Sequence, residues 1–261
     1  MKLDGIEEEQ EPLPTPNLGD DEVMIYAYRM AATAGYMHGW YRFPSSGPWN
    51  MEVVKNFGSE AADYGISAAT YANGKTYVYV MQHYGTDATG WNDYQMPIGF
   101  GIMDHETGEY EVLYDTSKGF HFFEYGDLVW DMAYDPVTDT IYAYTWAISS
   151  AGEFLDLTDI YTIDPVTCEP TFVGQLDCSI LAMAANNGRV YGLRQDYDEE
   201  AGKAVTSIVS FDPTNAVDGV FTSEHVVNIF NGHTVNYTIQ TLEFDLTNHS
   251  LWWMGFKNNV G

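Results

Sequence analysis

Ten aromatic, histidine and aspartate residues lie in the long connections that we expect between strands, and their types suit ligand binding. They are His83, Tyr84, Trp91, Asp93, His121, Trp146, Asp196, Tyr197, His233 and Tyr237. Aromatic rings stack on the apolar faces of a sugar or a peptide, while carboxylate and amide neighbours orient it. The alternative is that these rings pack under their own loops, because aromatic residues make up 15% of the chain.

The acidic run Asp196-Tyr197-Asp198-Glu199-Glu200 could hold calcium through its carboxylate oxygens. It lacks the glycine turn and the terminal bidentate Glu of an EF-hand loop, so a solvated loop is the simpler interpretation. The histidines show no pair at zinc-binding spacing, and the serines show no Gly-x-Ser-x-Gly elbow. We therefore expect no cofactor, with a calcium ion at the acidic run as the alternative.

Short runs rich in Val, Ile, Tyr, Phe and Trp fill the chain from Val23 onward, broken by Gly, Asn, Asp and Pro. This pattern is typical of β-strands. Strand–turn–strand units recur about every 58 residues, each with an aromatic residue after its turn. These aromatic residues are Tyr77, Tyr142, Tyr191 and Trp252. The first three units are followed by a second hairpin whose turn opens with Asp104, Asp164 or Asp212.

Repeated four-stranded antiparallel units predict an all-β fold, a β-propeller, whose blades pack face to face around an axis. The pattern Ala-x-Asp-Pro-x-Thr-x-x-Ile-Tyr at residues 133–142 and Ile-Asp-Pro-x-Thr at residues 163–167 resembles the YVTN, NHL and quinoprotein-like repeat propellers of bacterial secreted and surface proteins. A β-sandwich is the alternative fold, because it also has short strands but seldom a four-strand period.

The first 21 residues are acidic and rich in proline, so we expect a disordered tether there. The propeller should span residues 22–261, in units of about 22–57, 65–115, 129–176, 179–230 and an incomplete 239–261. A ring of six to eight blades at this period would need about 350 to 465 residues. The chain should therefore be a fragment of a longer one, or should close by pairing its last strands with its first.

The net charge of −28 argues against a nucleic-acid partner. No apolar run approaches the roughly 20 residues of a membrane helix, so we expect no membrane insertion. The composition favours an extracellular or cell-surface location. Cys168 and Cys178 flank a predicted strand at residues 171–176, which separates them by more than the roughly 7 Å limit for a disulfide. Both thiols should therefore be labelled by alkylation without reductant.

We expect short, uniform turns on one face of the propeller and long, varied connections on the other. Long loops on a rigid scaffold often contain functional residues, so the long connections are where we expect the function. We expect a non-enzymatic, secreted or surface-tethered protein that binds a glycan, peptide or protein through the long connections. Trp91 and Trp146 should then lie on the same side as His83, His121 and His233.

Two alternatives remain open. The first is a lactonase-like propeller hydrolase or lyase, which would need carboxylates converging on a metal in the axial channel. Only Asp131 and Glu243 are acidic residues that we can place near innermost strands, which is too few for such a site. The second is a structural spacer within a larger surface protein, possessing no site of its own.

Overall fold

The computed structural model describes residues 22–29, 38–47, 51–58, 64–84, 94–118, 128–149, 151, 153–200, 202–231, 235–246 and 250–257. These residues form strands and a single short 3-10 helix. No helix among them is long and apolar enough to cross a membrane. The expected tether at residues 1–21 lies outside the described residues.

The strands form four sheets of three to five strands and one two-stranded sheet. The first sheet contains β1 (Met24–Arg29), β2 (His38–Pro44) and β3 (Glu52–Gly58). The second contains β4 (Tyr64–Ala72), β5 (Lys75–Tyr84), β6 (Tyr94–Met103) and β7 (Tyr110–Asp115), followed by η1 (Thr116–Lys118). The third contains β8 (Asp131–Asp135), β9 (Thr140–Ile148), β10 (Phe154–Ile163) and β11 (Pro170–Leu176).

The fourth sheet contains β12 (Met183–Asn186), β13 (Arg189–Asp198), β14 (Lys203–Phe211) and β16 (Glu224–Asn231). The short strand β15 (Val220–Phe221) leaves this unit and pairs in parallel with β11, which gives the third sheet its fifth strand. The last sheet contains β17 (Val235–Asp245) and β18 (Ser250–Lys257). All other pairings between strands are antiparallel.

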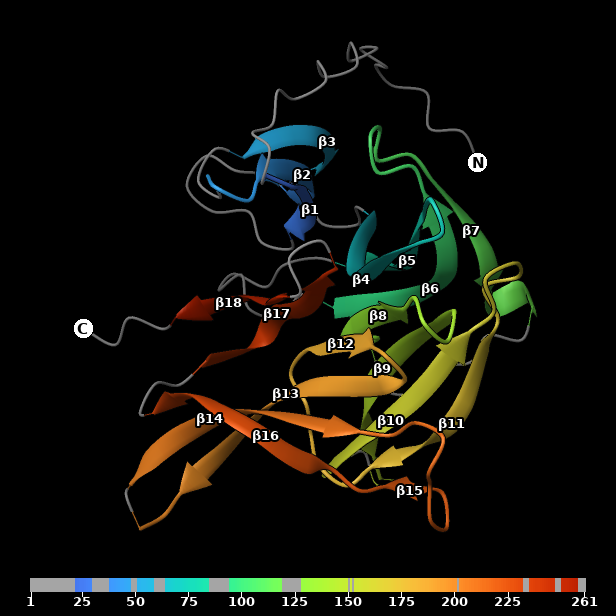
Figure 1. Ribbon diagram of the computed structural model, residues 1–261. Helices are drawn as coiled ribbons and strands as arrows, with labels where there is room; N and C mark the ends of the chain where they lie inside the picture. Colours follow the sequence, from blue (N-terminus) through green and yellow to red (C-terminus); the bar gives the residue numbers. More distant parts are fainter. Residues whose placement is uncertain are drawn as a thin grey trace.

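The sheets are arranged as blades in a ring, with β4, β8, β12 and β17 at its centre (Figure 1). Strand β8 packs against both β4 and β12, and β12 packs against β17. This arrangement confirms the predicted β-propeller over the alternative sandwich. Within the described strands, β17 and β18 pair with each other and not with the first sheet, so the expected closure by such pairing is not found there.

The hairpin turns form as their local sequence predicts. Asp104, Asp164 and Asp212 each accept a hydrogen bond of 2.8 Å from the backbone N–H two residues later. In the turn between β12 and β13, Asn187 and Gly188 both have positive φ angles, which Asn and Gly tolerate at low steric cost. Short-range chemistry therefore determines these turns.

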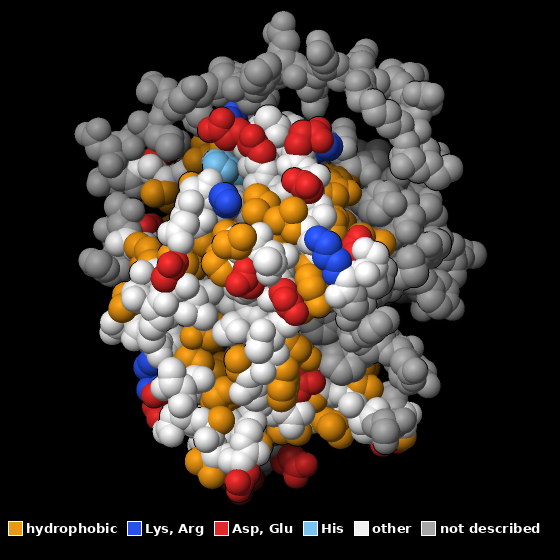
Figure 2. Space-filling model, turned by 90° about the vertical axis from the view of Figure 1, so that its right-hand side faces the viewer, with side chains coloured by type: hydrophobic (Ala, Val, Ile, Leu, Met, Phe, Trp, Pro, Cys, Tyr) orange, Lys and Arg blue, Asp and Glu red, His pale blue; other side chains and the backbone are white. Residues whose placement is uncertain are grey.

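Turn residues also expose apolar groups on one face of the propeller. Val137 is 65% exposed and Val166 is 78% exposed, each in a turn that opens with Asp-Pro. Figure 2 shows the side of the molecule on the right of Figure 1, where hydrophobic side chains are interspersed with acidic ones. These apolar groups are scattered between charges, as is normal on protein surfaces.

Neighbouring blades are joined by the aromatic residues of their second strands. Tyr77 in β5 donates a hydrogen bond of 2.9 Å from its hydroxyl to the carbonyl of Pro165, which directly follows the turn residue Asp164 of the next blade. Trp40 in β2 does the same from Nε1 to the carbonyl of His105, at 2.8 Å. The repeated aromatic residue of one blade thus donates a hydrogen bond to the repeated Asp turn of the next blade.

Replacing Tyr77 by Phe is expected to lower the free energy of unfolding by about 1 kcal/mol, because the Pro165 carbonyl loses its donor while the buried ring is kept. Urea denaturation would measure the loss. Tyr71→Phe is the matched control, since the Tyr71 side chain is 56% exposed, and its effect should stay within about 0.5 kcal/mol. Similar losses in the two variants would show that the Tyr77 hydrogen bond contributes nothing specific.

The two cysteines are free and buried, which confirms that they are not joined by a disulfide. Burial, reinforced by the nearby charge of Asp164, raises the pKa of the Cys168 thiol to about 11. Burial also raises the pKa of Cys178. The expectation that alkylation labels both thiols therefore needs a correction for the folded protein, because the reactive thiolate is both scarce and inaccessible there.

Thiol reagents are thus expected to react with neither cysteine in the folded protein on the time scale of minutes, and with both after unfolding in guanidinium chloride. Mass spectrometry after timed alkylation would measure this. Rapid labelling of the native protein at either position would contradict the burial of that thiol.

Candidate functional site

The innermost strand β17 presents an acidic side chain, Glu243, that is exposed to solvent. Protein around the carboxyl nevertheless removes enough water to raise its pKa to about 7, and the hydrogen bond from the Phe244 N–H, at 3.3 Å, only partly opposes the rise. At neutral pH its carboxyl is available both as a proton donor and as a proton acceptor.

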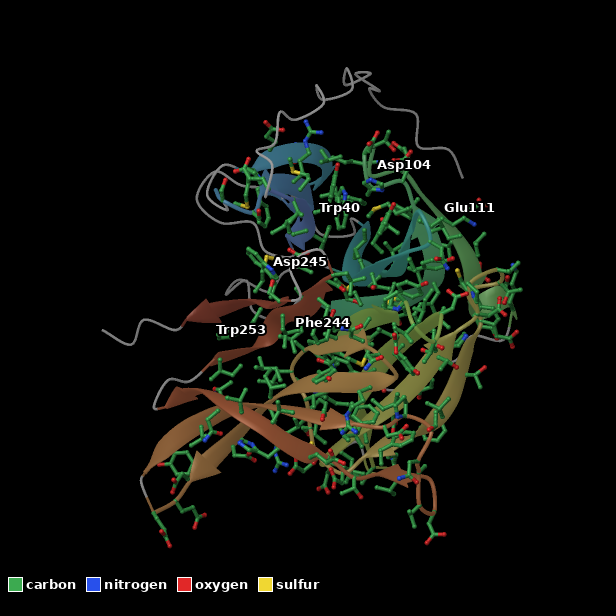
Figure 3. All side chains as sticks on the ribbon, in the orientation of Figure 1. Trp40, Asp104, Glu111, Phe244, Asp245 and Trp253 are labelled. Carbon is green, nitrogen blue, oxygen red and sulfur yellow. The ribbon has the colours of Figure 1, made fainter. Side chains whose placement is uncertain are left out.

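The alternation of side chains along β17 places Glu243 on the face of its hairpin opposite to the one that packs toward the fourth blade. Leu242, Phe244 and, on β18, Trp253 pack toward the fourth blade. Glu243 and Asp245 have the opposite parity and therefore lie on the other face of the strand. Figure 3 labels Phe244 and Asp245 on this strand. That face is the one which carries the candidate site.

An aromatic side chain accompanies Glu243 on this face. Trp252 in β18 pairs directly with Glu243 across the hairpin, and such pairs share a face with Cβ atoms about 4.5–5.5 Å apart. Trp252 is 36% exposed, and its Nε1 donates to Ser250 Oγ at 2.9 Å, which fixes the ring. A carboxyl of raised pKa beside an exposed indole suits a reaction on a sugar. The indole can stack on the sugar ring, and the carboxyl can transfer a proton to the bond that breaks.

A second acidic side chain, Asp131, lies at the first position of β8 and is only 2% exposed. Its oxygens accept hydrogen bonds from four donors on the three strands β8, β12 and β17: Met132 N (3.0 Å), Met183 N (2.9 Å), Thr241 Oγ1 (3.0 Å) and Leu242 N (3.4 Å). Burial raises the pKa of Asp131 well above its usual range, and the charge of Glu243 adds to the rise. Asp131 therefore joins the innermost strands and has no room to contact a substrate.

Three of the ten residues expected to bind a ligand have described side chains. Trp146 stacks on Trp130 with ring centroids 4.4 Å apart, and its Nε1 donates to the Ile180 carbonyl at 2.8 Å. Asp196 forms an ion pair with Arg194 at 2.8 Å, and Tyr197 is 66% exposed. Trp146 belongs to the third blade, whereas Asp196 and Tyr197 belong to the fourth.

The other seven expected residues stay predictions. His83, Tyr84 and Tyr237 lie in β5 and β17, but their side chains are outside the described part of the chain, as are Trp91, Asp93, His121 and His233 altogether. The expectation that Trp91 and the three loop histidines lie on the same side of the propeller as Trp146 also stays a prediction. Where the chain is described, no group of three or more His, Cys, Asp or Glu side chains could hold a metal ion.

The sequence analysis placed Glu243 near an innermost strand but assigned it no role. The residue paired with the repeated aromatic of each blade nevertheless distinguishes it. The residue paired with the repeated aromatic is small in three blades, where Thr70, Ala133 and Ala184 lie opposite Tyr77, Tyr142 and Tyr191. In the last blade the corresponding residue is Glu243. A charged side chain at a position that the repeat keeps small indicates a local function.

A carboxyl on the innermost strand of a β-propeller therefore defines the site, and comparison with solved structures places the fold. The chain is similar to an endo-1,4-beta-xylanase from Bacteroides thetaiotaomicron VPI-5482, with a TM-score of 0.53 and 11% identity over 91% of this chain and 84% of that one. It is also similar to 1,3Gal43A, an exo-beta-1,3-galactanase from Clostridium thermocellum, with a TM-score of 0.53 and 12% identity over 89% of this chain and 52% of that one. No family model and no curated protein matches the sequence.

These comparisons correct two expectations. The solved structures are propeller glycosidases rather than YVTN, NHL or quinoprotein-like repeat propellers, so that resemblance holds only for the propeller fold. The expected non-enzymatic binding protein is also wrong, because the propellers that this chain resembles are enzymes. The alternative of a propeller hydrolase agrees better with both the fold and the carboxyl of Glu243.

Proposed function

We propose that the protein is a propeller hydrolase that cleaves glycosidic bonds, with Glu243 as the proton-transferring group. The observation that carries this proposal is the exposed carboxyl on β17 with a pKa of about 7. Glycoside hydrolysis needs an acid that stays protonated near neutral pH, so that it can protonate the oxygen of the leaving sugar. The similarity to a xylanase and a galactanase supports a substrate of this chemical class.

Trp252 would support the sugar whose bond is cleaved. Its indole lies directly across the hairpin from Glu243 and is held by Ser250. A ring fixed in this way offers a flat apolar surface at little cost in conformational entropy. The sugar stacked on it would place its glycosidic oxygen within reach of the carboxyl.

Asp245 is the second carboxyl that the proposal uses, since most glycosidases need two. It lies two residues beyond Glu243 on the same face of β17, about 7 Å along the strand. We propose that Asp245 positions the second reactant, a water molecule, while Glu243 transfers the proton.

Hydrolysis assays test this function. Aryl glycosides of xylose, arabinose and galactose, together with xylan and β-1,3-galactan, would be screened for released sugar. Glu243→Gln should lower kcat/KM by at least about 100-fold, the usual size of a general-acid contribution. Glu111→Gln is the matched control, because Glu111 is also exposed but lies on the outer strand β7 (Figure 3).

Two results would contradict the proposal. One is the absence of hydrolysis for every substrate of the screen, and the other is full activity in Glu243→Gln. An extracellular or cell-surface location belongs to the same proposal, because sugar polymers are too large to enter cells intact. Fractionation of the producing cells would test the location separately.

A further inference from the structure

Three aromatic rings follow one another beside the connection between β9 and β10. Trp130 stacks on Trp146 with centroids 4.4 Å apart and planes at 28°, and Phe154 meets Trp146 edge-on at 5.7 Å and 85°. We call Trp130, Trp146 and Phe154 the aromatic track. Its outer member, Phe154, is 67% exposed, so the track runs from two half-buried indoles to the surface.

The inner part of the track is held rigidly. Trp146 donates from Nε1 to the Ile180 carbonyl at 2.8 Å, and the Trp130 N–H donates to the Tyr144 carbonyl at 3.1 Å. These bonds fix one indole ring and the backbone of the other. A rigid aromatic surface binds a ligand without first losing side-chain entropy.

An irregularity in β10 produces the exposed end. Phe154 pairs with Ile148 and Thr158 pairs with Trp146, so residues 155–157 lie opposite the single residue Ala147. The bulge leaves Phe154 and Leu155 exposed, although burying a phenylalanine side chain is worth about 1.5–3 kcal/mol. Bulges commonly re-aim side chains next to functional sites, and here the fold gains no packing from the exposure.

The inner end of the track is linked through Asp131 to β17, the strand that carries Glu243. Trp130 directly precedes Asp131, whose carboxylate binds Thr241 and Leu242. Those two residues directly precede Glu243 on β17. The track therefore starts one residue before Asp131, which is hydrogen-bonded to β17, and continues outward across the third blade.

We propose that the aromatic track is a subsite for sugar units beyond the bond that is cleaved, and that the substrate is a neutral polysaccharide or long oligosaccharide. This inference rests on the proposed function. Aromatic rings match the apolar C–H faces of sugars, and the exposed carboxylates of Glu153 and Asp156, one and two residues from Phe154 in the sequence, offer acceptors for hydroxyl groups. The net charge of −28 repels acidic polysaccharides, which leaves neutral ones as the occupant.

Binding to xylan and β-1,3-galactan oligosaccharides, measured by calorimetry in the Glu243→Gln background, tests the subsite without hydrolysis. Adding Phe154→Ala should weaken binding about fivefold to tenfold, as expected for an exposed anchor that meets ligand. Phe172→Ala is the matched control, because Phe172 is 53% exposed and meets Tyr161 edge-on at 5.5 Å on the outer strand β11. Its effect should stay within about twofold.

Kinetics separate the subsite from the function itself. With Glu243 intact, Phe154→Ala should raise KM for the polysaccharide and leave hydrolysis of an aryl monosaccharide unchanged. Loss of oligosaccharide binding in Phe154→Ala without hydrolysis by any form would support the subsite and reject the proposed function. Equal effects of Phe154→Ala and Phe172→Ala would overturn the subsite, as would no binding of neutral glycans, or preferred binding of polygalacturonate or a peptide.

Discussion

Replacing Asp131 by Ala is expected to lower the free energy of unfolding by about 3 to 5 kcal/mol. The buried carboxyl group accepts four hydrogen bonds, three of them from backbone N–H groups of β8, β12 and β17. Its removal leaves these donors buried without an acceptor, and each such donor costs about 1–3 kcal/mol. Urea denaturation followed by tryptophan fluorescence would measure the loss.

Asp164→Ala provides the matched control for this prediction. Asp164 also accepts several hydrogen bonds, from Val166 N (2.8 Å), Thr167 N (2.7 Å) and Thr167 Oγ1 (3.0 Å), but it lies in an exposed turn. Water can replace it there, so the expected loss is about 1 kcal/mol. If both substitutions destabilise the protein equally, Asp131 does not join the innermost strands in the way that its contacts indicate.

The activity proposed for Glu243 should depend on pH in a defined direction. Its pKa of about 7 leaves the carboxyl protonated below neutral pH, where a general acid is active. Above pH 7, kcat/KM should fall about tenfold per pH unit as the proton is lost. A profile that rises above pH 7 would instead assign Glu243 the role of a base.

The same titration should affect stability. The pKa of Glu243 is raised from the ordinary value of 4.5, so the folded protein binds this proton more tightly than the unfolded chain does. The resulting stabilisation is present at low pH and is lost as the pH rises from 4.5 through about 7. Glu243→Gln cannot ionise, so its melting temperature should exceed that of the wild type at about pH 8 by a few degrees, with little difference at about pH 4.

Glu111→Gln serves as the control for this pH comparison as well. Its melting temperature should stay close to that of the wild type, because Glu111 is an exposed side chain on the outer strand β7. A wild-type protein that is as stable as Glu243→Gln across the whole range would show that Glu243 titrates normally. In that case the carboxyl would not be poised for proton transfer at neutral pH.

The sequence by itself determined those features that depend on neighbours a few residues apart. Asp104, Asp164 and Asp212 each stabilise their turn by accepting a hydrogen bond from the backbone N–H two residues later. The Asn-Gly turn at residues 187–188 needs only residues that tolerate positive φ. Alternating apolar residues then determine the strands, and the four-strand period determines the propeller. All of this information is local or periodic, so it can be read without coordinates.

The tertiary structure alone decided which acidic residues have a raised pKa. Asp131 meets donors that are 52 and 110 positions away in the chain, from strands that come together only when the ring of blades forms. Asp164, the same residue type, remains in an exposed turn with its pKa lowered by local hydrogen bonds. The pKa of Glu243 likewise depends on how much water the assembled blades leave around it, because desolvation is set by all surrounding atoms and not by sequence neighbours.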